Sequence, residues 1–455
     1  MEYDAICIGG GPGGSAAAQQ VVQRGGTACL IERDRLGGTC LNVGCMPTKA
    51  LLASGERRWD MKSACDLALP AADVKPDGTL VMRRVHRIVD DLLTATRDKI
   101  DGIENLHLVG GEASVIDAHT VGVETEEGPK QFQGRCLVIA TGSQPVRPDF
   151  LPWSSERVWT NAEAVRAETL PESLLVLGGG PLGCEFACAY AELGSNVCLV
   201  EMKDRLLPLL PEYAGEAARK CLQQRGVDLH IGEKVIDVKS DGDRIRAECE
   251  SNCSFEGTHV LAALGRRACP RTMGLEKLGV ECRKDFIPVD ECCRTSVEGV
   301  FAAGDVAEAR NHSHLAERMG VVAGDQIMGV DSRDSRDVLP MGVYLHPHIA
   351  HVGRTGEDAR AAGFDPVTVR KDYADAGTAW LHARTDGGLE LTADRKSGQI
   401  LGATWIGPHA MDMLEEIVLA MKHELTVDQI YRTMHPHPSF QEMLHALAEQ
   451  LMTAD

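Results

Sequence analysis

The stretch YDAICIGGGPGG, residues 3–14, decides the fold. An apolar strand pattern ends in glycines, and an alanine-rich helical stretch follows. Gly9, Gly11 and Gly14 have the spacing GxGxxG, and the next predicted strand ends at Glu32. Such glycines let the backbone approach a pyrophosphate, the helix N-terminus stabilises its charge, and the carboxylate binds ribose hydroxyls. An ordinary glycine turn is the alternative, but the order strand, glycines, helix, strand, acid favours a dinucleotide site.

The same plan recurs in the middle of the chain. A second apolar strand leads into Gly178, Gly180 and Gly183, and the strand after the helix ends at Glu201. Two such units predict two doubly wound nucleotide-binding domains. The carboxylate favours NAD over NADP, because it accepts hydrogen bonds from a 2′-hydroxyl and repels a 2′-phosphate. Basic residues, Lys203 among them, follow this carboxylate closely, so weak accommodation of the 2′-phosphate of NADP is an open alternative.

Composition narrows the class of protein. The 455 residues suggest about three domains. A formal net charge of −20 disfavours nucleic acid and anionic membrane as partners. No apolar run reaches the roughly 18 residues of a membrane span. The 16 cysteines are spread along the chain, and no basic leader opens it, so we expect a cytoplasmic protein with mostly reduced thiols.

Two of the cysteines have a distinctive spacing. Cys40 and Cys45 belong to CLNVGC, which opens a predicted helix. Thiols at this spacing are close enough to form a disulfide, and a helix N-terminus favours a thiolate. Half of a zinc site and two buried thiols are the other interpretations. A zinc site needs two further ligands, and none is obvious nearby.

Four segments carry a resemblance to a known family. GTCLNVGCMPTK (residues 38–49) resembles the redox-disulfide signature of the pyridine nucleotide-disulfide oxidoreductases, in the wording of their dihydrolipoamide dehydrogenase branch. ATGS (140–143) and GVFAAGD (299–305) are similar to segments of the family that contact FAD, and TMHPHPSFQE (433–442) resembles its catalytic segment. The resemblance implies an α/β fold with two Rossmann-like doubly wound nucleotide-binding domains and a C-terminal α+β dimerisation domain.

The resemblance also implies the cofactors FAD and NAD and the residues that bind them. These cofactor-binding residues are Gly9, Gly11, Gly14, Glu32, Thr39, Lys49, Ala113, Thr141, Gly142, Ser143, Asp305, Leu315, Ala316, Gly178, Gly180, Gly183, Glu185, Glu201, Val235 and Gly265. Among them, Lys49 is expected near the flavin N5, paired with Glu185. From the residues alone, a surface lysine and a glutamate favoured by the helix dipole are an equally open alternative.

Four catalytic residues follow from the same resemblance. Cys40 would exchange with the substrate, and Cys45 would face the flavin. His437 would transfer the proton, a task that suits imidazole, and Glu442 would orient it. In the family this histidine reaches the disulfide of the other subunit, so the resemblance predicts a homodimer.

The predicted function is FAD-dependent oxidation of dihydrolipoyl groups by NAD⁺ through a Cys40–Cys45 redox disulfide. The lipoyl group would be carried by a lipoyl domain or a lipoate-binding protein, or would be free lipoamide. One alternative is another disulfide or mercuric reductase of the family that uses NAD(P)H. The other is a non-catalytic flavoprotein redox sensor.

The motifs divide the chain into four predicted segments. They are the first part of the FAD-binding domain (1–149), the NAD-binding domain (150–269), a central segment that completes the FAD domain (270–338) and the interface domain (339–455).

Strands are predicted in the interface domain at Val343–His346 and Thr378–His382. His346, His348 and His351 invite a metal hypothesis. Strand alternation, however, would place the first two on one face and the third on the other, so no metal site is predicted.

Overall fold

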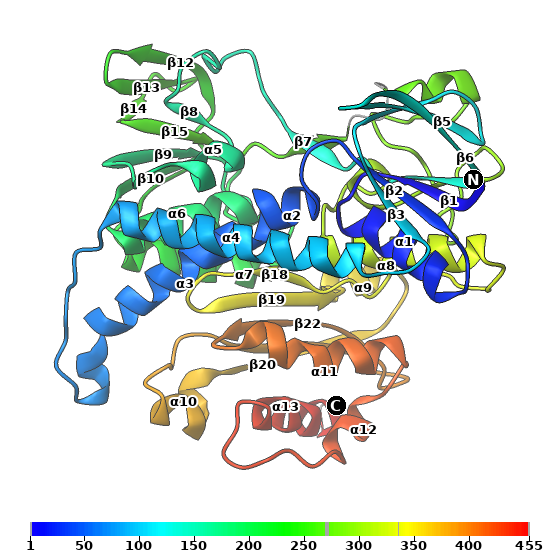
Figure 1. Cartoon of the computed structure of the whole chain (residues 1–455). Helices are drawn as coiled ribbons and strands as arrows, with labels where there is room; N and C mark the ends of the chain where they lie inside the picture. The colour runs from blue at the N-terminus through cyan, green and yellow to red at the C-terminus, as the bar shows by residue number, and fades with distance from the viewer. Residues whose placement is uncertain (1, 269–272, 335, 454–455) are drawn as a thin grey trace.

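The computed structural model describes residues 2–268, 273–334 and 336–453, and the predicted boundary at 269–270 falls outside them (Figure 1). The fold is α/β, as predicted: two Rossmann-like domains lie side by side, and a C-terminal α+β domain lies beneath both. Among the described helices, none has the length and apolarity that crossing a bilayer requires.

The first domain is built on a seven-stranded sheet in the order β3-β2-β1-β6-β5-β4, with β17 beside β6. Strand β17 and helix α8 come from beyond the second domain, yet they pair with β6 and pack on α1. The elements are β1 (Glu2–Ile8), α1 (Pro12–Gln23), β2 (Ala28–Glu32), α2 (Gly38–Asn42), α3 (Cys45–Lys62), α4 (Gly78–Asp101), β3 (Leu106–Gly110), β4 (Glu112–Val115), β5 (Thr120–Thr125), β6 (Gly128–Ile139), β17 (Val300–Ala302) and α8 (Ser313–Ile327).

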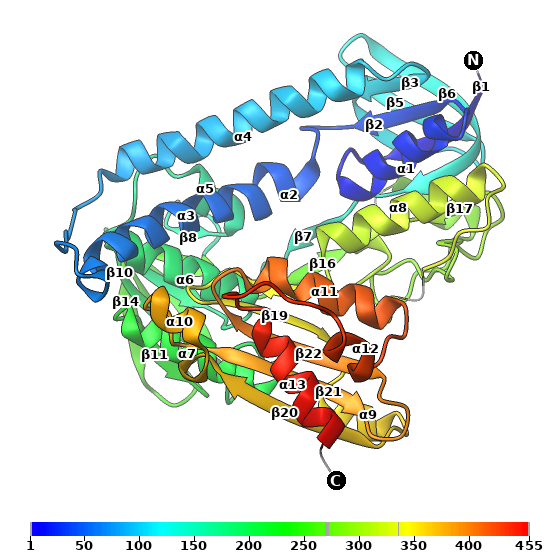
Figure 2. The ribbon, with the colours of Figure 1, turned by 90° about the horizontal axis from the view of Figure 1, so that it is seen from below.

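Helices α1 and α8 approach each other closely (Figure 2). A Cβ at Gly320 would lie 2.1 Å from the carbonyl oxygen of Gly13, so a larger residue there would separate the helices. Helix α1 begins at Pro12, earlier than the alanine-rich pattern suggests, because proline is favoured in the first turn, where its missing N–H costs no hydrogen bond.

The second domain holds a parallel five-stranded sheet in the order β11-β10-β9-β15-β8 and a smaller antiparallel sheet, β12-β13-β14. A two-stranded ribbon, β7 with β16, joins it to the first domain. The elements are β7 (Ser143–Pro145), β8 (Val158–Trp159), α5 (Asn161–Arg166), β9 (Ser173–Leu177), α6 (Pro181–Leu193), β10 (Asn196–Glu201), α7 (Glu212–Gln224), β11 (Asp228–Ile231), β12 (Val235–Asp241), β13 (Arg244–Cys249), β14 (Ser254–Gly257), β15 (His259–Ala262) and β16 (Arg266–Ala268).

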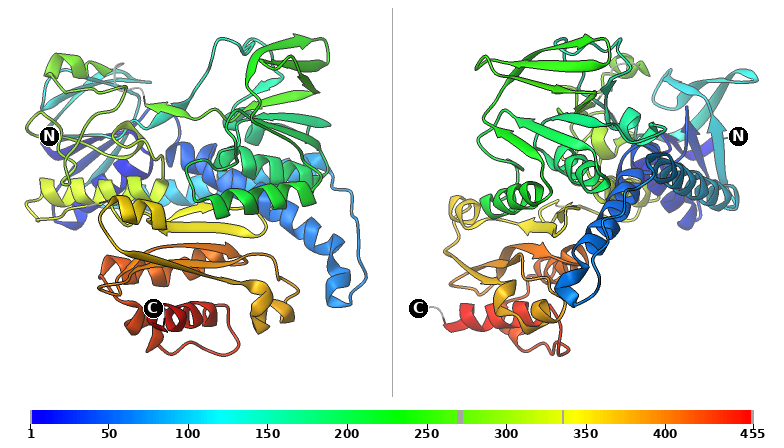
Figure 3. Two further views of the ribbon diagram at one scale, coloured as in Figure 1. Left: turned by 180° about the vertical axis from the view of Figure 1, so that it is seen from behind. Right: turned by 90° about the vertical axis from the view of Figure 1, so that its left-hand side faces the viewer.

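The C-terminal domain is an antiparallel sheet, β18-β19-β22-β21-β20, that lies between helices. Helices α11 and α13 pack on it from below, and α7 of the second domain contacts β19 and β22 from above (Figure 3). The elements are β18 (Met341–Val343), β19 (His348–Gly353), α9 (Gly356–Ala361), β20 (Pro366–Asp372), α10 (Gly377–Leu381), β21 (Gly388–Asp394), β22 (Ile400–Gly407), α11 (Ala410–Lys422), α12 (Val427–Tyr431) and α13 (Glu442–Thr453).

Two strand predictions in this domain were wrong. Residues 378–382 lie in helix α10 and its C-cap, where the sequence neighbours Thr378 and Ala379 are both buried, which one face of a strand does not allow. Strand β18 ends at Val343, and the next strand begins only after Pro347, whose nitrogen has no hydrogen to donate to a sheet. His346 therefore lies outside any strand, although its ring centroid lies 6.1 Å from that of His348.

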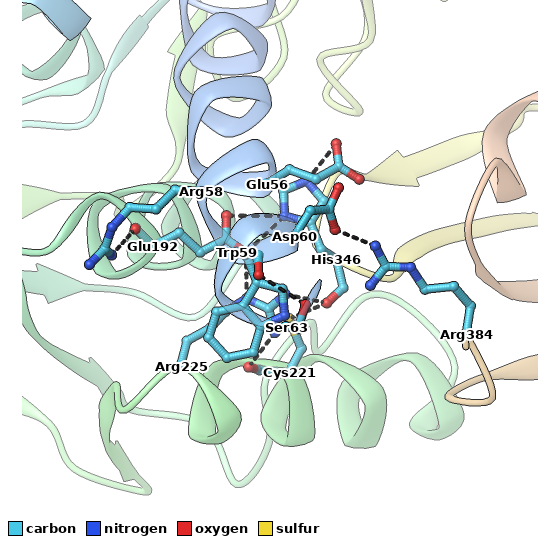
Figure 4. A network of polar contacts seen from close by, with 10 residues as sticks. All are labelled: Glu56, Arg58, Trp59, Asp60, Ser63, Glu192, Cys221, Arg225, His346 and Arg384. Atoms are coloured by element: carbon cyan, nitrogen blue, oxygen red, sulfur yellow. Dashed lines mark hydrogen bonds and ion pairs between the residues drawn. The ribbon is translucent and has the colours of Figure 1, made fainter. Parts of the chain in front are cut away.

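The three domains meet around the side chain of Glu192 on α6 (Figure 4). Its carboxylate accepts a hydrogen bond from Arg225 Nε at 2.6 Å and lies 2.9 Å from His346 Nδ1. Helix α3 of the first domain contributes Arg58, which donates to the Glu192 carbonyl at 2.5 Å, and Trp59, whose ring lies 4.4 Å from the Arg225 guanidinium. The junction therefore fixes the far end of α3 to both other domains.

Candidate functional site

The thiols of Cys40 and Cys45 lie side by side, but not as the sequence predicts. Cys40 belongs to the short helix α2, and Cys45 is the first residue of α3, so the pair flanks a break between two helices. Both are free thiols in hydrogen-bond contact, and the hydroxyl of Ser313 lies 3.5 Å from Cys45 Sγ. Cys45 therefore lies at the positive end of the α3 dipole.

The surroundings shift the pKa values of the two thiols in opposite directions. The hydrogen bond from Cys40, helped by Ser313 and by the positive charge of Lys49, lowers the pKa of Cys45 although burial opposes this. The same hydrogen bond, together with burial, raises the pKa of Cys40. When the pair loses a proton, the negative charge therefore resides on Cys45.

Lys49 and Glu185 form an ion pair next to these thiols. Lys49 Nζ lies 2.8 Å and 3.0 Å from the two carboxylate oxygens. Glu185 is buried and also accepts the backbone N–H of Tyr344 at 3.0 Å. Burial disfavours the charge of Lys49, but Glu185 outweighs it and raises the pKa of Lys49. The ammonium therefore stays charged, one helical turn from Cys45.

The first glycine loop has room for a ligand. A Cβ at Gly14 would lie 2.0 Å from the carbonyl oxygen of Gly9, so the helix packs directly on the strand end. A Cβ at Gly11 would meet no atom closer than 3.9 Å, which leaves open space in front of the helix N-terminus. Glu32 Oε2 accepts the N–H of Gly10 at 2.7 Å, which holds its carboxylate beside the loop. The loop fits a dinucleotide pyrophosphate.

The second glycine loop repeats this geometry. A Cβ at Gly183 would lie 1.9 Å from the carbonyl oxygen of Gly178, and a Cβ at Gly180 would meet nothing within 4 Å. The buried carboxylate of Glu201 accepts the N–H of Gly179 at 2.5 Å. The second loop therefore also fits a dinucleotide.

The basic residues beyond Glu201 do not form a phosphate clamp. Lys203 donates its backbone N–H to the Glu201 carboxylate at 2.6 Å, and the residue itself is exposed. The Arg205 guanidinium donates to the carbonyl oxygens of Leu210 and Pro208, at 2.8 Å and 3.0 Å. With the arginine held by the backbone, the geometry supports the predicted preference for NAD.

Asp305 and Ser143 meet at a third cluster. The Ser143 hydroxyl donates to Asp305 Oδ2 at 2.5 Å, and Arg266 donates to both the hydroxyl and the carbonyl of Ser143, at 2.8 Å and 2.7 Å. Arg266 Nη2 also lies 3.3 Å from Thr39 Oγ1, which joins the cluster to the helix of Cys40. Burial raises the pKa of Asp305, although Ser143 and Arg266 oppose this.

A buried hydroxyl nearby fits a bound group. Among the described residues, Thr141 Oγ1 is buried without a hydrogen-bond partner in the protein, so a ligand atom would satisfy it. The remaining predicted cofactor residues are Ala113 in β4, Gly142 before β7, Leu315 and Ala316 in the first turn of α8, Val235 at the start of β12 and Gly265 before β16.

His437 and Glu442 form a pair far from the thiols of the same chain. His437 Nδ1 lies 2.8 Å from Glu442 Oε1, and Ser439 donates its N–H to Oε2 at 2.9 Å. These bonds, the Ser439 one first, lower the pKa of Glu442. The His437 side chain is 83% exposed. Helix α13, which begins at Glu442, lies across the C-terminal sheet from α2, which carries Cys40 (Figures 1 and 3).

A cavity opens beside this histidine. Its volume is about 460 Å³, and it is lined from α10, α13 and the end of β20 by residues that include Leu381, Met443 and Lys371. An apolar wall with one ammonium at its edge accommodates a chain that is partly aliphatic and partly polar.

Three residues of the site escaped the sequence analysis. Ser313 precedes the predicted contact pair at residues 315–316, and Arg266 follows the predicted Gly265. Tyr344 has its ring centroid 4.6 Å from Lys49 Nζ. None of the three lies in the four segments that carry the resemblance, and none has a spacing that sets it apart. Their contribution is visible only when the first domain, the ribbon and the C-terminal domain are assembled.

Comparison with known proteins agrees with this geometry. Residues 3–320 match the family described as pyridine nucleotide-disulphide oxidoreductase, and residues 339–448 match its dimerisation domain. The chain is 33% identical to the dihydrolipoyl dehydrogenase of Haloferax volcanii over 98% of this chain and 96% of that protein. Identity to a dihydrolipoyl dehydrogenase of Bacillus subtilis is 32%, over 99% and 96%.

Two solved structures share the whole architecture. The HOCl-induced flavoprotein disulfide reductase of Escherichia coli has a TM-score of 0.88 and 25% identity, over 98% of this chain and 99% of that one. LpdA of Mycobacterium tuberculosis has a TM-score of 0.92 and 24% identity, over 99% and 100%, and shows the fold alone.

Proposed function

Because the chain belongs to the pyridine nucleotide-disulphide oxidoreductase family, we propose that it is a dihydrolipoyl dehydrogenase, which oxidises dihydrolipoyl groups with NAD⁺. It is an enzyme of this family and uses FAD and NAD. Two relatives named dihydrolipoyl dehydrogenase, at 33% and 32% identity over nearly the full length, support this substrate. The observation that carries the proposal is the pair of adjacent thiols beside the Lys49–Glu185 ion pair.

The thiol pair acts by thiol–disulfide exchange. A substrate thiolate attacks Cys40 of the oxidised pair, the S–S bond breaks, and Cys45 leaves as a thiolate. Its lowered pKa makes it the better leaving group. The second substrate thiol then displaces Cys40, so the substrate becomes a lipoyl disulfide and the protein pair gains two electrons. A bound FAD would supply the redox chemistry that passes those two electrons on to NAD⁺ as a hydride.

The loops assign the two cofactors. The loop of Gly9, Gly11 and Gly14 would hold FAD, and Thr141 and Asp305 would bond its polar groups. The loop of Gly178 to Gly183 would hold NAD, with Glu201 on its ribose. Lys49 would stay charged beside the flavin, because Glu185 compensates its burial.

The proton would be handled by a second subunit. His437 is exposed and lies across the C-terminal sheet from Cys40, so a homodimer assembled through the matched dimerisation domain would bring it to the thiols of the other subunit. Glu442, acidified by the Ser439 N–H and by His437, would keep its charge and orient the imidazole as it accepts the substrate proton. The predicted cytoplasmic location stays a prediction.

Steady-state assays with a panel of substrates test this proposal. We expect lipoamide-dependent turnover in both directions, with NAD⁺ preferred over NADP⁺. The 25% identity to a flavoprotein disulfide reductase supports a second candidate, a reductase that runs from NAD(P)H towards another disulfide. Faster reduction of glutathione disulfide or mercuric ion than of lipoamide would favour it. An enzyme that binds FAD but turns over none of these would point to a redox sensor.

A further inference from the structure

Three side chains that can bind a metal ion, two thiols and one carboxylate, meet at the edge of the second domain. Cys249 ends β13, Cys253 precedes β14, and Glu233 lies in the turn before β12. Their ligand atoms all lie within 4.8 Å of one another, and Cys253 Sγ is 3.4 Å from Glu233 Oε2. No step of the proposed reaction uses these residues.

The contacts that Cys253 makes are close to the edges of a tetrahedral zinc site. Zinc–sulfur bonds of about 2.3 Å place two sulfurs about 3.8 Å apart, and a carboxylate oxygen lies about 3.6 Å from each sulfur. The measured contact between Cys253 and Glu233 is 3.4 Å, and the Cys249 and Cys253 thiols are already in hydrogen-bond contact. A cation could therefore be bound with small movements of three side chains.

The backbone holds the three ligands in place. Cys249 donates its N–H to the carbonyl of Cys253 at 2.9 Å, and Asn252 donates to the carbonyl of Cys249 at 3.0 Å, which closes a tight turn. Glu250 donates to the carbonyl of Lys234 at 2.9 Å, so the turn that carries Glu233 is bonded to the hairpin. Most of the ordering that a metal site requires is thus present without the metal.

The Ser251 hydroxyl lies 2.5 Å from Glu233 Oε2 and 3.2 Å from Cys253 Sγ, so a bound cation would replace contacts to one exposed serine. Two other groups of this kind are less suitable. In the group of Cys198, Asp228 and His230, the ring nitrogen Nε2 of His230 already contacts the Asp228 carboxylate at 2.9 Å. In the other, the Arg225 cation already neutralises Glu192.

We propose that Glu233, Cys249 and Cys253 bind one zinc ion, with an open fourth position for water or a further ligand. The sequence analysis missed this site, because Glu233 is far along the chain from the hairpin and its approach depends on the pairing of β12 with β13.

The site lies behind the predicted NAD pocket. The backbone N–H groups of Gly232 and Glu233 donate to the carbonyl of Glu201, at 2.8 Å and 3.0 Å. A zinc ion on Glu233 would therefore hold the turn that supports the ribose-binding carboxylate. This consequence rests on the proposed function, whereas zinc binding itself does not.

Zinc content after equilibrium dialysis is the direct test. The protein, with FAD bound, is reduced, dialysed against buffered zinc and measured by mass spectrometry for metal. The Cys40→Ser background breaks up the redox thiol pair, so that the pair cannot compete for zinc as two adjacent ligands. We expect one zinc per subunit. Cys253→Ser and Glu233→Gln should each weaken zinc binding at least about 100-fold, because losing a direct ligand costs more affinity than losing a residue that only contacts a ligand. Cys65→Ser, which removes an exposed thiol elsewhere, should bind zinc like its parent.

Two results would overturn the site. One is the absence of zinc after dialysis at micromolar free zinc, and the other is equal zinc content in the parent and both ligand variants. Glu233 and Cys253 are only half-buried, so their variants should fold even if Cys249→Ser does not. Zinc binding together with no lipoamide turnover by the enzyme with intact Cys40 would support the site and refute the proposed function. Where turnover is present, removal of zinc should raise the KM for NAD⁺ in the enzyme with intact Cys40 and leave its KM for lipoamide unchanged.

Discussion

Cys45 owes its acidity to neighbours from three parts of the chain. Cys40 donates from α2, Ser313 from the start of α8, and Lys49 adds positive charge from the next turn of α3. A hydrogen bond to a charged group contributes about 1.5–3 kcal/mol, and one pKa unit corresponds to about 1.4 kcal/mol. Each neighbour is therefore able to move the pKa of the thiolate by a measurable amount.

Ser313→Ala should shift the titration of Cys45 to higher pH. In the two-electron-reduced enzyme the Cys45 thiolate should give a long-wavelength absorption band with the flavin. Loss of the hydroxyl should move the pH midpoint of this band upward by about one unit. Ser54→Ala, which removes a hydroxyl bonded to Ala50 on the same helix, should leave the midpoint unchanged. A band that survives in Cys45→Ser would reject the assignment of the charge to Cys45.

His437→Gln should slow the oxidation of the dithiol and leave FAD bound. Loss of a positioned base typically costs a factor of about 10² to 10⁴. Glu442→Gln should slow the same step less, because the imidazole remains and only its orientation is lost. Transfer of electrons from NADH to an artificial acceptor serves as the control, since it bypasses the thiols. Turnover of lipoamide at the wild-type rate would remove His437 from the mechanism.

Helix α6 holds the redox helix α3 at two places. Glu185 and Glu192 are seven residues apart on α6 and so lie on the same side of it. Glu185 binds Lys49 near the thiol end of α3, and Glu192 lies at the junction with Arg58 and Trp59 near its other end. The position of Cys45 therefore depends on contacts along the whole length of α3.

Glu192→Gln should destabilise the protein strongly. Its carboxylate is fully buried, and its removal would leave the Arg225 guanidinium buried without a counter-charge. Breaking a buried pair in this way costs about 3–5 kcal/mol. Glu56→Gln, which removes a half-exposed carboxylate 3.5 Å from His346, should cost far less. Thermal unfolding of the three proteins measures the difference, and equal midpoints would contradict this account of the junction.

The junction should also make stability depend on pH through His346. Burial opposes its charge, but Glu192 and then Glu56 outweigh burial and raise the pKa of His346. The folded state therefore holds the His346 proton more tightly than the unfolded state does. The resulting stabilisation is complete below the unfolded pKa of about 6.5. It is lost as the pH rises through the folded pKa. The difference in unfolding temperature between wild type and His346→Gln should be largest between about pH 5 and 6 and shrink at higher pH. A difference that grows with pH would contradict this.

Elements that are determined by residues close together in the sequence could be predicted. Features that form only when distant segments pack together could not. The glycine loops, their acids Glu32 and Glu201 and the fold class were apparent from local pattern. Helix α10 was mistaken for a strand, because its short apolar pattern mimics alternation. The Glu192 junction joins three distant segments, and no spacing within any one of them indicates it.

At the scale of the whole molecule, the proposed active site needs two chains. Helix α2, which carries Cys40, and helix α13, which begins at the Glu442 partner of His437, lie on opposite sides of the C-terminal sheet (Figure 1). If the site is shared, co-expressed Cys45→Ser and His437→Gln subunits should regain activity, since each mixed dimer has one intact site. Random pairing in a closed dimer should give about a quarter of the wild-type rate. Each variant expressed alone is the control. No recovery, with mixed dimers verified by mass spectrometry, would place the whole site within one subunit.

The split construction of the first domain has a consequence for synthesis on the ribosome. Its sheet gains β17 and its helix α1 gains α8 only from residues 300–327, after the entire second domain has been translated. Domains generally fold as units in the order in which they emerge. Here the nascent first domain must wait without the pairing of β17 with β6 and without α8 packed on α1 while the second domain folds. Chaperone demand during translation should therefore be concentrated on the N-terminal third of the chain.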